Sequence, residues 1–140
     1  MNDEYNPLIL KATRVTTENP FFNTKFKETF GVLCSVVHKS ACDKGFWRED
    51  IGSNKPDTQE CAVKSALIHG EVSEFVEAIR KPQMLPDKHL KNRANYEVEL
   101  ADIVIRVMDL AEALRVDLAG AILEKIQFNK TREPMHGKTF

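Results

Sequence analysis

The sequence is poor in cysteine and contains no long apolar run, and each of these absences excludes a class of protein. Its three cysteines, Cys34, Cys42 and Cys61, form no CxxC pair, so neither a disulfide framework nor a cysteine-based zinc site is expected. No apolar run approaches the roughly 18 residues of a membrane span, and the acidic N-terminus lacks a signal-peptide pattern. We therefore expect buried free thiols and a cytoplasmic protein that does not bind a membrane.

The sequence also lacks an excess of charge of either sign. Its formal net charge is −1 and its isoelectric point is near 6.4, which gives no electrostatic indication of nucleic-acid binding. Hydrophobic residues make up 42% of 140 residues, enough for one hydrophobic core. Residues 1–22 show no sustained period and are predicted to be an N-terminal arm, whose segment "LILKATRV" is either a short strand or a contact with another subunit. Residues 23–140 are predicted to form a single helical domain with a basic C-terminal tail.

Four stretches of this domain show the periodicity of amphipathic helices, which predicts an all-α bundle of four main helices. The first is expected to begin at Asn23 or Thr24 and to end at Gly45. The second has a capping-box pattern at its start, with Asp57 followed three residues later by Glu60. The third is expected to begin at Asn92 or Asn95, and the fourth follows the predicted cap Asp117.

Two pairs of acidic residues stand out on the second and third helices. Glu71 and Glu74 are spaced i, i+3, and so are Glu99 and Asp102. Each precedes a residue of its helix's apolar stripe, which places it about 100° from that stripe. If the two helices pack together, the four carboxylates can converge at the edge of the contact.

Carboxylates that converge in a half-buried place need a compensating charge. Mg²⁺ prefers oxygen ligands and leaves positions for water and phosphate. Zn²⁺ would be expected to recruit His or Cys, and no His/Cys cluster of ligand spacing is visible. The alternative is that these acids form an ordinary solvated helix face, as Glu77 and Glu97 are expected to do.

The segments "EVSE" and "ELAD" that carry these acids resemble the ExxE…ExxD signature of the MazG-like all-α nucleoside triphosphate pyrophosphatases. The segments "DKGFWRED" and "LAGAILEKIQFNKTREPMHGKTF" also resemble that family, and the likeness covers roughly residues 24 to 138. It implies Mg²⁺, for which Mn²⁺ can substitute, bound by Glu71, Glu74, Glu99 and Asp102. It further implies hydrolysis of a (d)NTP to (d)NMP and pyrophosphate, with Glu74 as our candidate base. House-cleaning of non-standard nucleotides is the kind of role this suggests.

The resemblance also implies residues that bind the substrate. Lys125 and Asn129 lie one helical turn apart and are expected to approach the phosphates, Lys125 with a catalytic role, and Arg132 continues the basic run. The alternative for these cations is solvated charge at a helix end. His38 and Trp47 are candidates for contacts with the base. Their alternatives are a structural histidine, and a core or oligomer contact for the tryptophan.

The family resemblance implies a homodimer, or a tetramer built from two dimers. Two alternative functions stay open. One is a non-catalytic helical interaction module that holds a structural cation. The other is a relative specific for dUTP, dCTP or phosphoribosyl-ATP, because nothing in the sequence determines which base is preferred.

Overall fold

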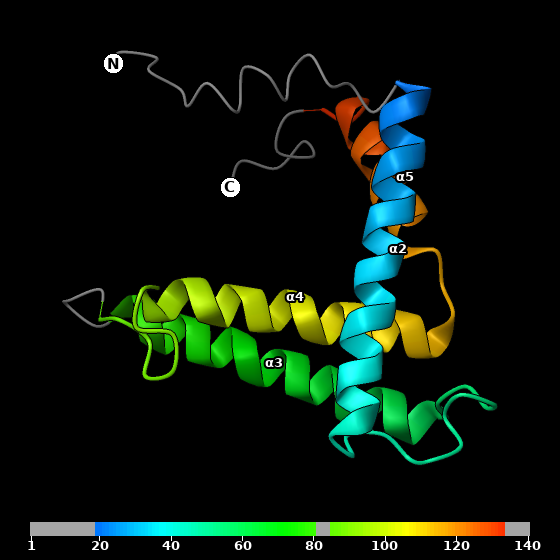
Figure 1. The fold of residues 1–140 in the computed structure, drawn as a ribbon. Helices are drawn as coiled ribbons and strands as arrows, with labels where there is room; N and C mark the ends of the chain where they lie inside the picture. Colours follow the sequence, from blue (N-terminus) through cyan, green and yellow to red (C-terminus); the bar gives the residue numbers. More distant parts are fainter. Residues whose placement is uncertain (1–18, 81–84, 134–140) are drawn as a thin grey trace, which may run out of the picture. The chain divides into compact units, whose positions relative to one another are not determined.

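The structure, a computed structural model, describes residues 19–80 and 85–133. This part of the chain contains four helices, which are α2 (Pro20–Asp43), α3 (Thr58–Arg80), α4 (Asn95–Leu114) and α5 (Leu118–Lys130) (Figure 1). Its only β-pairing is an isolated bridge in the loop before α4. The predicted all-α class is confirmed. None of the helices in this part is both long and apolar enough to cross a membrane.

The start of the first helix differs from the prediction. Helix α2 begins at Pro20, and the side-chain oxygen of Asn19 accepts hydrogen bonds from the backbone N–H groups of Phe21 and Phe22. Asn19 is therefore the N-cap, and proline suits the first position because its missing N–H would have no partner there. The predicted caps Asn23 and Thr24 are wrong. The arm up to residue 18 lies outside the described residues, as does the tail from residue 134.

The other predicted helix ends are confirmed. Asp57 and Glu60 form a reciprocal capping box, with N–H···O distances of 2.8 and 2.9 Å. Asp117 accepts the backbone N–H of Gly120 at 2.8 Å. Gly45 has a φ of 77° and follows α2, where its N–H and that of Phe46 bond back to the last turn. This left-handed conformation favours glycine over residues with a Cβ.

The chain divides into two compact units, and Leu33–Val116 is one of them. Within this unit α3 and α4 pack side by side and run in opposite directions (Figure 1). Its small core consists of Trp47, Ile51 and Ala113, with Cys42 and Leu110 packed against it. All three cysteines are free, and of these Cys34 is buried whereas Cys42 and Cys61 are only partly buried, so the expectation of buried thiols holds for Cys34 alone.

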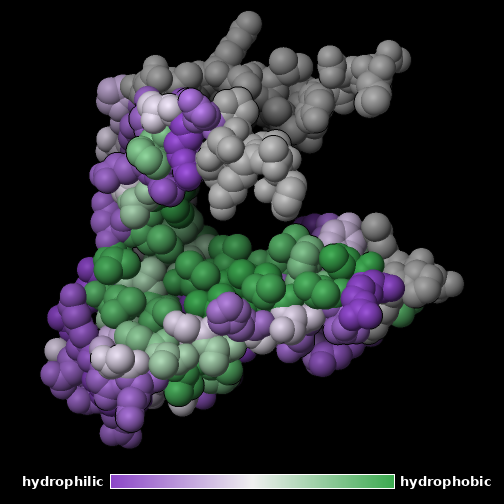
Figure 2. Space-filling model, turned by 180° about the vertical axis from the view of Figure 1, so that it is seen from behind, coloured by the Kyte–Doolittle hydropathy of each residue, from purple (hydrophilic) through white to green (hydrophobic). Residues whose placement is uncertain are grey.

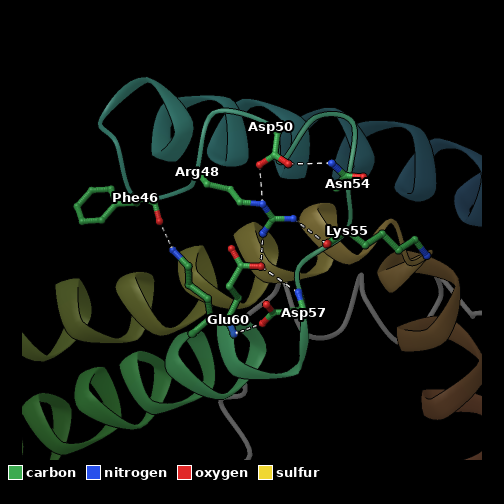
Figure 3. Close-up of polar contacts among 8 residues, drawn as sticks. Phe46, Arg48, Asp50, Asn54, Lys55, Asp57 and Glu60 are labelled. Carbon is green, nitrogen blue, oxygen red and sulfur yellow. Dashed lines mark hydrogen bonds and ion pairs between the residues drawn. The ribbon is translucent and has the colours of Figure 1, made fainter.

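The loop between α2 and α3 is fixed by polar contacts centred on Arg48 (Figure 3). The Arg48 guanidinium pairs with Glu60 and with Asp50 and donates a hydrogen bond to the backbone oxygen of Lys55. Glu60 also belongs to the capping box of α3, so one carboxylate ties the loop to the helix start. This arrangement determines where the neighbouring residues Phe46 and Trp47 lie.

The other unit consists of the chain up to Val32 and from Asp117 onward. Its described part contains the first half of α2 and the whole of α5. Lys27 Nζ lies 3.2 Å from Asp117 Oδ2, which links the two helices. Ala119 and Leu123 are the buried apolar residues of α5.

Candidate functional site

Three of the four predicted acidic residues converge between α3 and α4. Glu71 on α3 and Glu99 and Asp102 on α4 each offer a carboxylate oxygen, and these oxygens lie within 4.8 Å of one another. Helical spacing explains the arrangement, since residues three apart share a face and the two helices are in contact. We call these three residues the acid cluster.

The acid cluster is poorly solvated. Glu71 and Glu99 are each 8% exposed, and Asp102 is half-buried. Burial raises the pKa of Glu99, and the nearby charge of Glu74 raises it further. Burial also raises the pKa of Asp102, and the Glu71 carboxylate adds to this effect. Such a cluster favours any cation that can replace the lost hydration.

The donors of the cluster suit a hard divalent cation. All three are carboxylate oxygens, the ligand type that Mg²⁺ and Mn²⁺ accept, and no His or Cys belongs to the group. Asn95 orients one of them, because its amide Nδ2 donates to Glu99 Oε1 at 3.1 Å. Such outer hydrogen bonds fix the geometry of ligands before a metal binds.

Glu74, the fourth predicted ligand, lies outside the group of converging oxygens. It is exposed, but its charge acts on both Glu99 and Asp102. Together with Glu77, Asn95 and Glu99 it lines a pocket of about 400 Å³ on one side of the cluster. Its role as metal ligand or as base therefore stays a prediction.

One residue that contacts the acid cluster, Arg106, was not predicted from the sequence. Its Nε donates to Glu71 Oε1 in a close ion pair. Arg106 follows Asp102 by four residues and Glu99 by seven, so all three share one face of α4. This spacing could be seen in the sequence, but the ion pair with Glu71 on another helix could not be predicted from it.

A second pocket, of about 410 Å³, adjoins the acid cluster at Asp102 and Arg106. We call it the cluster-side pocket. Its other wall includes the exposed ring of Phe46, together with Lys64 and Asp109, and apolar side chains of α2 complete it. An aromatic ring, apolar walls and a few polar groups are the usual lining of a small-molecule site.

His38 and Trp47, which were predicted to contact the nucleotide base, both contact Asp109, a residue that lines this pocket. Trp47 is 7% exposed, and its indole N–H donates to Asp109 Oδ1 at 2.7 Å. His38 Nδ1 lies 2.7 Å from the same oxygen, and the two rings pack edge to face. Lys64 Nζ lies 3.9 Å from the centre of the Trp47 ring and donates to the backbone oxygen of Phe46. These contacts hold both rings in place, and their contact with a base stays a prediction.

Replacing Asp109 with alanine is expected to lower the free energy of unfolding by roughly 2 kcal/mol or more, because it leaves two poorly solvated donors without their acceptor. Asp109→Asn keeps an acceptor oxygen, so its free energy of unfolding should fall by less. The exposed Asp43, which pairs with Lys39, is the control, and its alanine variant should change stability by at most about 1 kcal/mol. Urea denaturation of the three variants measures the difference. If Asp109→Ala lowers the free energy of unfolding no more than Asp43→Ala does, the role assigned to Asp109 is wrong.

The predicted phosphate contacts lie on and just after α5, in the other unit. Lys125, Asn129 and Arg132 are all exposed. Lys125 Nζ lies 4.8 Å from the centre of the Phe128 ring, and the Arg132 guanidinium lies over the same ring. Their approach to a substrate stays a prediction.

Comparisons with known proteins point to nucleotide chemistry. No family model matches the chain, and no solved structure matches it. The chain is similar to dCTP pyrophosphatase 1 from Bos taurus, with 39% identity over 71 residues that cover 48% of this chain and 42% of the relative. It is also similar to dCTP pyrophosphatase 1 from Mus musculus, with 35% identity over 74 residues and the same coverage.

The chain spans less than half the length of these curated relatives. The comparison confirms the resemblance to the MazG-like all-α nucleotide pyrophosphatases that the acidic residues indicated.

Proposed function

We propose that this protein is a Mg²⁺-dependent nucleoside triphosphate pyrophosphohydrolase that releases a nucleoside monophosphate and pyrophosphate. The observation that supports this most is the convergence of Glu71, Glu99 and Asp102 beside a pocket of nucleoside size. The similarity to dCTP pyrophosphatases supports the same reaction class. A cytoplasmic location fits the proposal.

The acid cluster would hold the cation, and Glu74, whose charge acts on Glu99, would serve as a fourth ligand or accept a proton from water. A bound divalent cation supplies neutralisation of phosphate charge and lowers the pKa of a bound water. Residues of the chain position the ligands of this cation and exclude water. Asn95 orients Glu99, and the half-buried surroundings of the cluster limit competing water.

The nucleoside would lie in the cluster-side pocket, which places the α-phosphate next to Asp102 and Arg106. The exposed Phe46 ring offers a stacking surface there, and we retain His38 and Trp47 as base contacts or supports of that wall. We also retain Lys125, Asn129 and Arg132 as the phosphate contacts that the family resemblance implies.

A panel of canonical and modified nucleoside triphosphates tests this proposal, with Mg²⁺ or Mn²⁺ present and pyrophosphate as the measured product. dCTP is the first member to test, followed by dUTP and phosphoribosyl-ATP. Release of pyrophosphate that stops in excess chelator is the expected result. Release of orthophosphate alone would contradict the proposed bond. No hydrolysis across the panel would favour the alternative, a non-catalytic module with a structural cation.

We further propose that the protein is a homodimer, alone or paired into a tetramer. Large apolar side chains of α3 and α4 are exposed in the single chain, and Figure 2 shows apolar side chains gathered over this pair of helices. They are Val72, Val76, Ile79, Leu100, Val104 and Ile105. Monomers seldom leave such contiguous apolar surface in water.

Light scattering at micromolar concentration is expected to show at least a dimer. Val76→Lys should weaken the association, because it places a charge within the apolar surface, whereas Gln59→Lys at an exposed position earlier on α3 should not. A stable and active monomer of the unmodified chain would contradict the proposal.

A further inference from the structure

Arg106 is the one guanidinium among the described residues that both contacts the acid cluster and lines the cluster-side pocket. We propose that it binds the α-phosphate of the nucleotide, at the junction between the nucleoside and the cation. The inference rests on the proposed function and adds a named residue with a defined role. Sequence patterns did not indicate it.

The position of Arg106 on α4 is the first argument. Glu99, Asp102, Arg106 and Asp109 follow one another along a single face of the helix. The first two belong to the acid cluster, and Asp109 belongs to the far wall of the pocket. Arg106 therefore lies between the pocket and the acid cluster. If the base of a nucleotide occupies the pocket, its α-phosphate lies beside Arg106.

The geometry of its ion pair is the second argument. Arg106 is bound to Glu71 through Nε, and the part of the chain that the structure describes shows no other hydrogen bond from its guanidinium. A guanidinium has five N–H donors in a planar fork. The donors on its two terminal nitrogens thus stay available for a phosphate, which guanidinium groups can bind through two parallel hydrogen bonds. Its side chain is 34% exposed, so a ligand can reach it.

The local charge is the third argument. Lys64 lines the same pocket, and its pKa is lowered chiefly by burial and in part by the nearby positive charge of Arg106. The Asp109 carboxylate in the same pocket opposes this lowering, and a phosphate between the two cations would stabilise both of them further. The acid cluster beside them would repel a phosphate unless a cation were bound, so substrate and cation are expected to bind together.

A purely structural role is the competing explanation. In that case Arg106 would only neutralise Glu71, and its loss would act on nucleotide binding solely through the affinity of the acid cluster for Mg²⁺. The two roles therefore differ once Mg²⁺ saturates the variant, because a weaker metal site then no longer limits nucleotide binding. A phosphate contact contributes to the binding of nucleotides and contributes nothing to the binding of the same nucleoside without phosphate.

The test compares the two ligand classes by calorimetry in the whole 140-residue chain, at a Mg²⁺ concentration shown by titration to saturate each variant. The probes are the α,β-methylene analogues of the four deoxynucleoside triphosphates, which cannot be cleaved at that bond, and the four deoxynucleosides. For the analogue bound best, Arg106→Met should raise the dissociation constant about tenfold to a hundredfold, the usual range for a hydrogen bond to a charged group. Binding of the matching deoxynucleoside should stay within about twofold.

Two further variants make the result specific. Arg106→Ala should recover part of the lost affinity when free guanidinium is added at millimolar concentration, because the ion can occupy the vacated space. Arg80→Met is the matched control, since Arg80 is exposed and its one ion pair with a described residue is to Glu77. It should bind both ligand classes as the wild type does. Thermal melting of each variant identifies any that fails to fold, and Arg106→Lys then replaces Arg106→Met.

The outcomes separate the inference from the proposed function. If the wild type binds none of the analogues, the proposed function fails, and the inference fails with it. If the wild type binds an analogue and Arg106→Met binds it equally well, the inference alone is wrong. A parallel loss of nucleotide and nucleoside binding would also overturn it, because that result indicates a structural role.

Discussion

Turnover by a Glu99→Gln variant is expected to fall by about a hundredfold or more, while its folded structure persists. Glutamine keeps the size of the side chain but removes a charged oxygen ligand from the acid cluster. A bound cation is worth several kcal/mol to the transition state of phosphate chemistry, and each 1.4 kcal/mol is a factor of about ten in rate. Steady-state kinetics with saturating Mg²⁺ measures the loss.

The stability of the same variant provides an independent check. Burial and the charge of Glu74 raise the pKa of Glu99, which means that its ionised form is disfavoured in the folded protein. Glutamine removes the buried charge and its repulsion with the neighbouring carboxylates. The melting temperature of the variant in chelator should therefore be equal to or higher than that of the wild type. Added Mg²⁺ should raise the wild-type melting temperature and leave the variant unchanged.

Glu77→Gln is the matched control for Glu99→Gln. Glu77 lies on α3, is exposed and pairs with Arg80 at 3.0 Å. Its change should leave turnover and the response to Mg²⁺ almost unaltered. Full activity in Glu99→Gln would refute the metal assignment. A Glu99→Gln protein that is destabilised in chelator would contradict the account of the cluster as a set of repelling charges.

Lys125→Met is the second variant with a large expected effect on turnover. Lys125 is exposed on α5, and its ammonium lies 4.8 Å from the centre of the Phe128 ring. Methionine keeps an unbranched chain of high helix propensity that can still pack on that ring. The melting temperature should barely move, since exposed substitutions usually change stability by about 0.5 kcal/mol or less.

The kcat/KM of Lys125→Met should nevertheless fall roughly tenfold to a thousandfold. If Lys125 contacts the phosphates, it stabilises charge that develops as the α–β bond breaks. Lys25→Met is the control, because Lys25 is an exposed lysine of α2 in the same unit and pairs only weakly, at 3.5 Å, with Glu28. If Lys125→Met melts early and its folded fraction keeps full activity, Lys125 is structural and the role implied by the family resemblance is wrong.

The sequence predicted those features of the fold that depend on neighbours along the chain. The capping box of Asp57 and Glu60 and the cap at Asp117 are local patterns, and the structure contains them as predicted. The start of α2 was predicted too late, at Asn23 or Thr24, because a proline such as Pro20 more often breaks a helix than belongs to one. The same proline is favourable as the first residue of a helix that Asn19 caps.

The same distinction applies to the candidate site. Glu71, Glu99 and Asp102 could be predicted to converge because their spacing on two helices gives each the same offset from the apolar stripe. Arg106 could not, because its ion pair with Glu71 depends on the register between α3 and α4. The contact of Asp109 with Trp47 joins residues 62 apart in sequence, and nothing local to either residue indicates it.

The most direct test of the central claim follows bound Mn²⁺ by electron paramagnetic resonance while turnover of the preferred nucleotide is measured on the same sample. Metal binding and turnover are predicted to rise together as Mn²⁺ is added, and both should be lost in Glu99→Gln but not in Glu77→Gln. Undiminished turnover by the wild type in excess chelator, with no bound metal detectable, would contradict the claim that the acid cluster holds the catalytic cation.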